Sequence, residues 1–297
     1  MRTNAVIRII AYSLAIILLL SILIGVLFFG LYFDGGRVQT HRSEEHIAPT
    51  EGLVTQFQFS DEIKNIEIEW VSGSITVRPR ETVNGIYVAE HMGRDVSKAM
   101  VCKQSGQTLK IQFTDESFKF PSLGINVDYS KDLVIDVPAN WVCNSLEINT
   151  ASAAVEIENL TMEEFDFDGA SGDCYLNNCN VEEIDMDTAS GNIEFTGKLD
   201  VLNIDAASAD CSITTYKTPR AIEMNTASGD LELVLPPDAG FHLELDTLSG
   251  NLDSDFEFGT VGATYIHGDG TCKIKVNAMS GDVSILKGVS EPENCDH

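Results

Sequence analysis

The chain has 297 residues and a formal net charge of −27, because 46 Asp and Glu residues face only 19 Lys and Arg. All of the acidic residues follow residue 33. A surface this acidic repels phosphate backbones and anionic lipid headgroups, so the composition argues against a nucleic-acid-binding protein. The length is sufficient for one or two domains with a hydrophobic core.

The first predicted element is an apolar segment near the N-terminus. Residues 9–33 contain no charged residue, and they exceed the roughly 20 apolar residues that a membrane-spanning helix needs. A cleaved signal peptide is the alternative. Its apolar region is usually only about 7–15 residues long and ends at small residues, whereas this segment ends in LFFGLYFD. We therefore predict an uncleaved transmembrane helix over residues 9–33.

The charges around this segment predict its orientation. Arg2 and Arg8 precede it, so the positive-inside tendency places residues 1–8 in the cytoplasm. The lipid bilayer is then the first expected partner, and everything after the helix lies outside the cytoplasm. Residues 34–51 are polar and contain Gly and Pro, which is typical of a linker. The sequence thus predicts a single-pass protein of the cell membrane with an extracytoplasmic C-terminal domain.

From residue 52 onward, apolar and polar residues alternate in short runs, as in half-buried strands, and no amphipathic helix is predicted. The clearest predicted strands cover residues 63–70, 74–77, 107–113 and 132–137. We divide this part of the chain into an irregular β part, a regular repeat and a polar tail, at residues 52–140, 141–286 and 287–297.

The regular part repeats a phrase such as NTASGDLEL, which occupies residues 225–233. The Ser at its centre recurs at Ser72, Ser152, Ser171, Ser190, Ser208, Ser228, Ser249 and Ser280, and we call these the anchor Ser residues. From Ser152 they follow at steps of 19, 19, 18, 20, 21 and 31 residues, and the longest step holds an insertion near residues 253–271. The step from Ser72 to Ser152 is 80 residues, close to four periods. Such a period is typical of a repeat architecture.

Apolar side chains occupy fixed positions around each anchor Ser. The residues six and four positions before it, and three and five positions after it, are apolar or Cys, with Ser254 as the exception. The spacing of two predicts strands with one buried face, and the change from even to odd offsets requires a corner or a bulge at the Ser-Gly phrase. We therefore predict an all-β fold, a β-solenoid of about 19–20-residue coils with two short strands per coil, preceded by the transmembrane helix.

The Ser-Gly phrase itself is interpreted as a structural corner. Ala153 and Ala209 replace the Gly that follows the Ser in other coils. Ala in a left-handed backbone would cost roughly 1 kcal/mol, so we expect that the corner demands smallness rather than that backbone. A repeated catalytic nucleophile is the alternative, but G-x-S-x-G is absent and only His242 and His267 lie in or beside the repeats. Ser and Thr hydroxyls at turns commonly bond local backbone groups.

Acidic residues recur three positions before and two positions after the anchor Ser. The candidate ligands for a cation are Asp168, Asp187, Asp205 and Asp246 in the first column, and Asp173, Asp210, Asp230 and Asp282 in the second. Carboxylates stacked about 4.8 Å apart repel by about 1 kcal/mol per pair even in water. Interspersed Asn residues and bonds from Asx side chains to backbone N–H groups would relieve this repulsion, and so would Ca²⁺ bridging neighbouring coils. We expect the structural solution and keep Ca²⁺ as the alternative cofactor, although the G-G-x-G-x-D signature is absent.

The seven Cys residues are not arranged as C-x-x-C. Cys174 and Cys211 share one predicted column but lie two coils apart, at roughly 9–10 Å, which is too far for a disulfide bond. We expect both as reduced core residues. Cys179 is expected in the far turn of its coil and Cys295 in the polar tail, where both could react.

Three features of the sequence occur together: the N-terminal anchor, the passage LVIDVPANWVCNSLEINTASAAVEI at residues 133–157, and the succession of TASGD-like corners. In these features the chain resembles the bacterial putative-adhesin family of β-strand-repeat domains of unknown function, over roughly residues 52–286. The resemblance implies a β-solenoid on the outer face of a membrane, and it brings no catalytic residues.

We expect a non-catalytic protein that acts as a surface binding, adhesin-like or scaffold module of the bacterial cell envelope, with a cell-wall polymer as a possible partner. The alternative is an accessory protein of envelope-stress sensing or signalling that contacts another membrane protein. A polysaccharide-acting enzyme is the third choice, because its site would need an acid–base pair in a cleft built by long loops and these coils are short.

Overall fold

The computed structural model describes residues 53–92, 99–114, 130–261 and 264–288. The predicted transmembrane helix over residues 9–33, its cytoplasmic flank, the linker and Cys295 lie outside these described residues. Within the described ranges, no helix has the length and apolar character needed to cross a membrane.

All regular elements of the described chain are strands, which confirms the predicted all-β class, and they join into one 19-stranded sheet. In chain order they are β1 (Leu53–Phe59), β2 (Asn65–Arg80), β3 (Ile86–Met92), β4 (Val101–Ser105), β5 (Thr108–Gln112), β6 (Lys131–Pro138), β7 (Val142–Glu158), β8 (Thr161–Gly169), β9 (Cys174–Ser190), β10 (Ile193–Ser208), β11 (Cys211–Thr215), β12 (Ala221–Ser228), β13 (Leu231–Leu235), β14 (Phe241–Ser249), β15 (Leu252–Ser254), β16 (Gly259–Val261), β17 (Thr264–His267), β18 (Cys272–Ser280) and β19 (Val283–Lys287).

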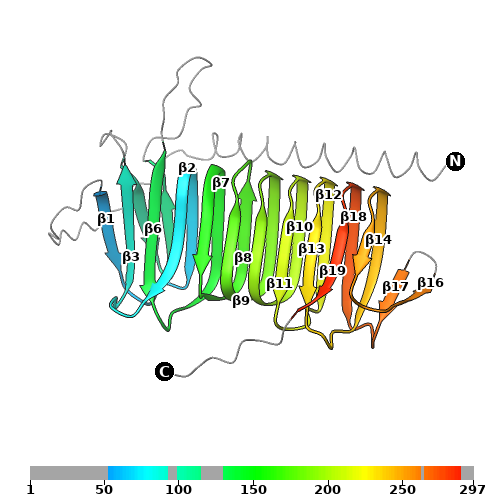
Figure 1. Ribbon diagram of the computed structural model, residues 1–297. Coiled ribbons are helices and arrows are strands. Elements are labelled where there is room, and N and C mark those ends of the chain that lie inside the picture. The colour runs from blue at the N-terminus through cyan, green and yellow to red at the C-terminus, as the bar shows by residue number, and fades with distance from the viewer. Residues whose placement is uncertain (1–52, 93–98, 115–129, 262–263, 289–297) are drawn as a thin grey trace, which may run out of the picture.

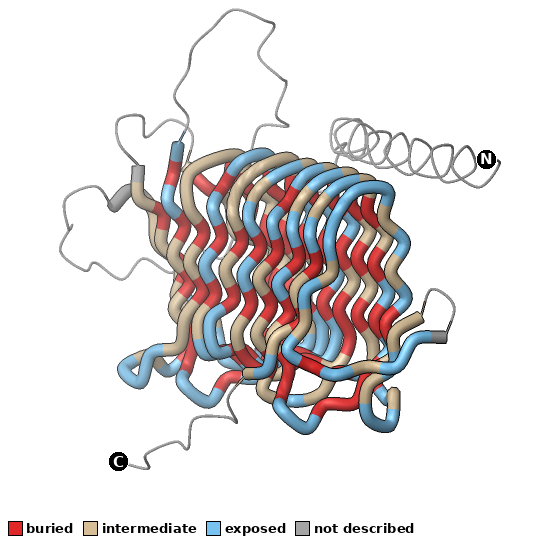
Figure 2. Tube along the Cα trace, turned by 45° about the vertical axis from the view of Figure 1, so that its right-hand side comes forward, coloured by how far each residue is buried: buried red, intermediate tan, exposed pale blue. Residues whose placement is uncertain are grey.

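The sheet winds into a stack of coils, seen from the side in Figure 1. From β7 to β13, neighbouring coils pair in parallel, and the anchor residues Ser190, Ser208 and Ser228 lie in register. The predicted apolar columns are also in register, because Phe167 pairs with Met186 and Met186 with Ile204. Several strands are longer than the expected five residues, since ladder pairing continues around a corner. In Figure 2, buried positions alternate with exposed ones and line up from coil to coil.

The order of the coils differs from the order of the sequence at the C-terminal end. β18 is the last strand of the chain that leads to an anchor Ser. It nevertheless pairs with β12 on one side and with β14 on the other. β19 likewise pairs with both β13 and β15. The insertion near residues 253–271, which contains β16 and β17, therefore carries the chain past the end of the stack and back into it. Ile274 and Val276 fill the apolar column between the coils of β12 and β14, which both come earlier in the sequence.

The N-terminal end shows the same arrangement. Ser72 and Ser152 are direct partners in register although 80 residues separate them, so no further coils of the stack lie between them. The intervening chain instead supplies β5 and β6, which pair with the two halves of β2 on its other side. β3 then adds antiparallel to β6, and β1 adds antiparallel to β3. The first and the last coil of the sequence are therefore both covered by a coil from further inside the chain.

The corners show why the Ser is followed by a small residue. Five of the Gly residues at this position have φ between 110° and 144°, namely Gly73, Gly172, Gly191, Gly229 and Gly281. A Cβ on Gly191 would lie 2.1 Å from the carbonyl oxygen of Gly172. The expectation that smallness alone decides was therefore incomplete, because these corners also need a backbone that side chains disfavour. Ala153 and Ala209 are buried and lack a positive φ, so their corners take a second backbone form.

The cysteines of the described chain are free thiols. Cys174 and Cys211 are buried with Ile193 in register between them, as the repeat predicted. The expectation for Cys179 was wrong, because this side chain is fully buried on β9 with Sγ near the carbonyl of Ile157. Burial raises the pKa of the Cys179 thiol to about 11, which leaves it protonated and unreactive at neutral pH.

Candidate functional site

Acidic side chains two positions after the anchor Ser form a ladder with the backbone of the next coil. In each step the carboxylate Oδ1 accepts a hydrogen bond from the N–H of the equivalent residue one coil further along. The bonds run from Asn192 to Asp173 at 2.8 Å, from Asp230 to Asp210 at 3.0 Å, from Asp282 to Asp230 at 2.8 Å and from Asn251 to Asp282 at 2.7 Å. These four predicted Asp residues thus satisfy corner N–H groups, as expected for Asx side chains, but between coils rather than within one.

The candidates three positions before the anchor Ser fall into two groups. Asp168, Asp187 and Asp205 lie in register on β8, β9 and β10. Asp246 lies on β14 and is separated from them by Asn225 and Asn277. Asn225 Nδ2 donates to Asp205 Oδ1 at 2.8 Å, and Asn277 Nδ2 donates to Asn225 Oδ1 at 2.6 Å. The Asn residues therefore relieve the repulsion at one end of the column.

Other outward carboxylates enlarge the first group into a continuous surface. We define the acidic face as the acidic residues three, five and seven positions before an anchor Ser on β7, β8 and β9, which are Glu147, Glu164, Asp166, Asp168, Glu183, Asp185 and Asp187. Glu147 pairs with Asp166, and Asp166 pairs with Asp185. Sequence reasoning missed this middle column, which stands five positions before the anchor Ser, because it considered only the positions that flank the corner.

Four Asp residues of the acidic face have pKa values above their usual range. Partial burial raises the pKa of Asp166 to about 6, and the negative charges of Glu164, Asp185, Glu147 and Asp168 add to the shift. Partial burial likewise raises the pKa of Asp187 to about 6, with further contributions from Asp168, Asp205 and Asp185. The pKa values of Asp168 and Asp185 are raised for the same reasons. The neighbouring negative charges that contribute to these shifts repel one another at neutral pH, and a bound positive charge would relieve that repulsion.

An open groove of about 420 Å³ lies along the residues seven and eight positions before the anchor Ser of successive coils. Its charged lining residues are Glu163, Glu164, Glu182, Glu183, Asp200 and Arg220. The groove and the acidic face share Glu164 and Glu183, so they form one continuous surface.

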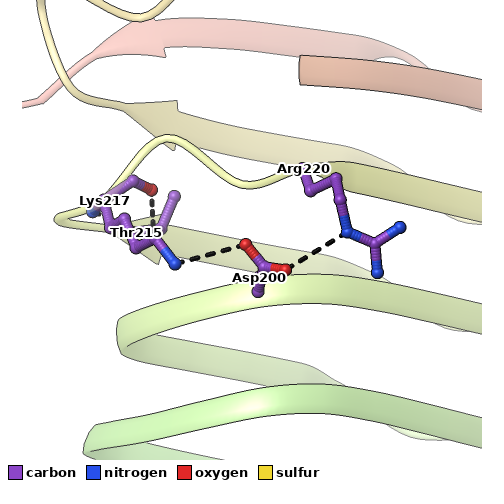
Figure 3. Close-up of polar contacts among 4 residues, drawn as sticks. All are labelled: Asp200, Thr215, Lys217 and Arg220. Carbon is purple, nitrogen blue, oxygen red and sulfur yellow. Dashed lines mark hydrogen bonds and ion pairs between the residues drawn. The ribbon is translucent and has the colours of Figure 1, made fainter. Parts of the chain in front are cut away.

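Asp200 connects this groove to positive charge (Figure 3). Its carboxylate lies 3.2 Å from Lys217 Nζ and 3.3 Å from Arg220 Nε. Partial burial pushes the pKa of Asp200 upward, but the hydrogen bonds and charges of the two cations outweigh it and hold the pKa below its usual value. Thr215 fixes the turn beside it, because its hydroxyl donates to the carbonyl of Lys217 at 2.8 Å. The positive charges at this end of the groove are thus paired with Asp200.

Among the described residues, no group of three or more His, Cys, Asp or Glu side chains is placed to hold a metal ion. Bridging of neighbouring coils by Ca²⁺ stays a prediction, as does the absence of any other cofactor.

The corner Ser hydroxyls take part in backbone contacts. Ser152 Oγ donates to the carbonyl of Val71, and Ser171 Oγ to that of Ala151, both at 3.4 Å. His267 Nδ1 lies 2.5 Å from the carbonyl oxygen of Glu257. These contacts agree with a structural role for the corner Ser residues.

A family model described as Toastrack DUF4097 matches residues 63–219 and 155–286. No curated protein matches the chain. Similar solved structures include a putative adhesin from Bacteroides fragilis NCTC 9343, which is 13% identical, covers 82% of this chain and 99% of its own, and has a TM-score of 0.45.

Two further structures have comparable coverage. A putative cell adhesion protein from Clostridium sporogenes ATCC 15579 is 12% identical, with coverage of 79% of this chain and 98% of its own and a TM-score of 0.37. A putative lipid binding protein from Parabacteroides distasonis ATCC 8503 is 15% identical, with coverage of 79% and 95% and a TM-score of 0.39.

Proposed function

Because this chain belongs to the Toastrack DUF4097 family, whose domains have no established function, we propose a role from its own surface: a non-catalytic binding module of the bacterial cell envelope. The acidic face is its contact surface. The partner is a polymer or protein that presents positively charged groups, and a cell-wall polymer is the first candidate.

The observation that carries this proposal is the regular spacing of carboxylates on the acidic face. Paired strands lie about 4.8 Å apart, so carboxylates in register form rows with that repeat across β7, β8 and β9. The pKa values of Asp166 and Asp187 are raised first by burial and then by neighbouring carboxylates, and a positive partner would relieve this second contribution. An array of this kind suits a partner with repeated positive charges better than a single small ligand.

The rigidity of the stack favours binding without large rearrangement. The strands under the face are paired in parallel on both sides, and Asp173 further joins the corner of its own coil to the next through the N–H of Asn192. A surface that is already ordered loses little conformational entropy when a partner binds.

The proposed location follows from the segment before the domain. Residues 9–33 would anchor the protein in the bilayer as a single-pass helix, with residues 1–8 in the cytoplasm. The linker over residues 34–51 would then place the coils outside the membrane, where a cell-envelope partner is accessible.

Site-specific photo-crosslinking of the anchored chain in bacterial cells tests the contact surface. The photoreactive residue replaces Asp185 on the acidic face in one variant. In the control variant it replaces the exposed Glu232 on β13, the strand that follows the anchor Ser228. We expect wall polymer to be captured from position 185 and not from position 232. Equal capture at both positions, or none at position 185, would contradict the proposal.

The same experiment separates the alternative function. Recovery of one membrane protein from position 185, in place of wall polymer, would favour an accessory protein of envelope-stress sensing or signalling. A polysaccharide-acting enzyme would instead shorten the captured polymer, which can be measured by its length distribution.

A further inference from the structure

A fully buried pair of opposite charges lies in the N-terminal cap, away from the acidic face. Lys131 on β6 is 1% exposed and Glu90 on β3 is 0% exposed. Their strands are antiparallel neighbours, with Glu90 opposite Leu133 and Met92 opposite Lys131, so the two side chains are diagonal neighbours on the inner face of the sheet. Lys131 Nζ lies 2.5 Å from Glu90 Oε1.

Aromatic side chains enclose the amine. Lys131 Nζ lies 4.1 Å from the ring centroid of Phe113 and 5.7 Å from that of Trp70. The same nitrogen donates to the carbonyl of Phe113 at 2.6 Å, and Trp70 Nε1 donates to the carbonyl of Lys131 at 3.0 Å. Two full charges in such surroundings carry a large desolvation cost, and a reaction that removes both charges removes that cost.

The two carboxyl oxygens of Glu90 are held differently. Oε2 accepts a hydrogen bond from the N–H of Met100 at 2.9 Å. Oε1 has no hydrogen-bond partner among the described residues, although Lys131 Nζ lies 2.5 Å from it. The nitrogen therefore approaches the carboxyl group closely without the geometry of a hydrogen bond. The fold thus holds the amine in contact with the carboxyl group, which lowers the entropic cost of forming a bond between them.

We propose that Lys131 and Glu90 form an intramolecular isopeptide bond, a side-chain amide that joins Lys131 Nζ to Glu90 Cδ. A proton first moves from the ammonium to Oε1, which leaves a neutral amine and a neutral carboxylic acid. The Nζ lone pair then attacks Cδ, and the negative charge that develops on Oε2 is stabilised by the Met100 N–H.

The second half of the reaction releases water. A proton passes from Nζ to the departing hydroxyl, the bond from Cδ to Oε1 breaks, and the carbonyl at Oε2 re-forms. An ammonium and a carboxylate have become one amide and one water molecule, so no oxidant, reductant or cofactor is required. Exclusion of water from the cap then protects the amide from hydrolysis.

The bond would fasten the end of the domain that the chain enters through β1. β3 pairs with β1 on one side and with β6 on the other, so the amide joins the β1–β3 pair to the stack. It closes a loop between residues 41 positions apart in the sequence, which restricts the unfolded chain as a disulfide bond does. The proposal does not depend on the function of the acidic face.

Mass spectrometry of the reduced full chain, purified in detergent, tests the proposal. We expect an intact mass about 18 Da below that of the sequence, the mass of one water. Trypsin should fail to cut after Lys131, and tandem spectra should show a branched peptide that joins the segment containing Glu90 to the segment containing Lys131.

Two variants serve as controls. Lys131→Arg retains the charge but cannot form the amide, so it should have the full sequence mass and no branched peptide. Glu90→Gln should reach the same amide by loss of ammonia, about 17 Da. Wild-type protein at its full sequence mass, with normal cleavage after Lys131 and no branched peptide, overturns the proposal whether or not the variants fold.

Discussion

At the scale of single residues, the corners of this solenoid depend on two features: an Asp carboxylate that accepts a backbone N–H of a neighbouring coil, and a Gly with positive φ. Each Asp two positions after an anchor Ser accepts one N–H from the next coil, as Asp230 does from Asp282 at 2.8 Å. Each Gly with positive φ lets the backbone of the next coil approach, as Gly191 does over Gly172. The Asp role can be shared by Asn, which also offers a side-chain oxygen, but the Gly role cannot be shared by any other residue.

This difference gives the first prediction. Gly191→Ala should lower the free energy of unfolding by at least about 1–2 kcal/mol, because Ala disfavours this backbone, and the clash of Cβ with the Gly172 carbonyl adds to the loss. Chemical denaturation followed by circular dichroism measures the change.

The matched control is Ala209→Gly at a corner without positive φ, where we expect a loss of only about 0.5–1 kcal/mol. Equal losses at the two corners would show that smallness alone matters, as the sequence suggested.

At the scale of the strand, the acidic face is a set of parallel strands that brings like charges into register. Column analysis of the sequence predicted the register of β7 to β13 correctly, because apolar spacing of two and the anchor Ser constrain both limbs. It did not predict the outward column of Asp166 and Asp185, although the same offsets, read five positions before the Ser, would have revealed it. The unusual titration of this column could not be predicted from composition, since it depends on the degree of burial and on the neighbouring coil.

The raised pKa values predict that stability falls as the pH rises. Asp166 and Asp187 have pKa values of about 6 in the folded state, against an ordinary value of 3.8 for Asp. Between these values the folded chain binds more protons than the unfolded chain, so the slope of unfolding free energy against pH is negative. We expect the midpoint of thermal unfolding to rise when the pH is lowered from about 7.5 to about 5.

The double variant Asp166→Asn/Asp187→Asn should lose most of this pH dependence and should be more stable than wild type at neutral pH. Glu232→Gln on the second limb, which lies outside the acidic face, is the control and should leave the dependence intact. If the double variant keeps the wild-type dependence, the acidic face is not its source.

At the scale of the whole molecule, the first and the last coil of the sequence each lie one coil inside the end of the stack. The apolar columns of the sequence identify which residues share a face, but every coil offers similar columns, so they do not identify which coils are neighbours. Partners such as Ser72 and Ser152 therefore could not be assigned from the sequence. The buried Lys131–Glu90 pair was missed for the same reason, because it depends on the antiparallel cap that this insertion creates.

The insertion makes the last coil of the sequence a structural bridge. β18 and β19 connect the coil of β12 and β13 to the coil of β14 and β15. In a stack of this kind each coil is stabilised by its immediate neighbours. Deletion of residues 272–297 should therefore unfold residues 236–271 as well, while the coils before residue 235 remain folded.

Limited proteolysis with hydrogen exchange measures this effect, because the loss of a neighbour removes ladder hydrogen bonds from β14 along its length. A matched truncation after residue 235 should give the same protection of the remaining coils as the shorter deletion does. If β14 and β17 stayed protected after removal of β18, their own antiparallel pairing would suffice, and the last coil would be a cover rather than a bridge.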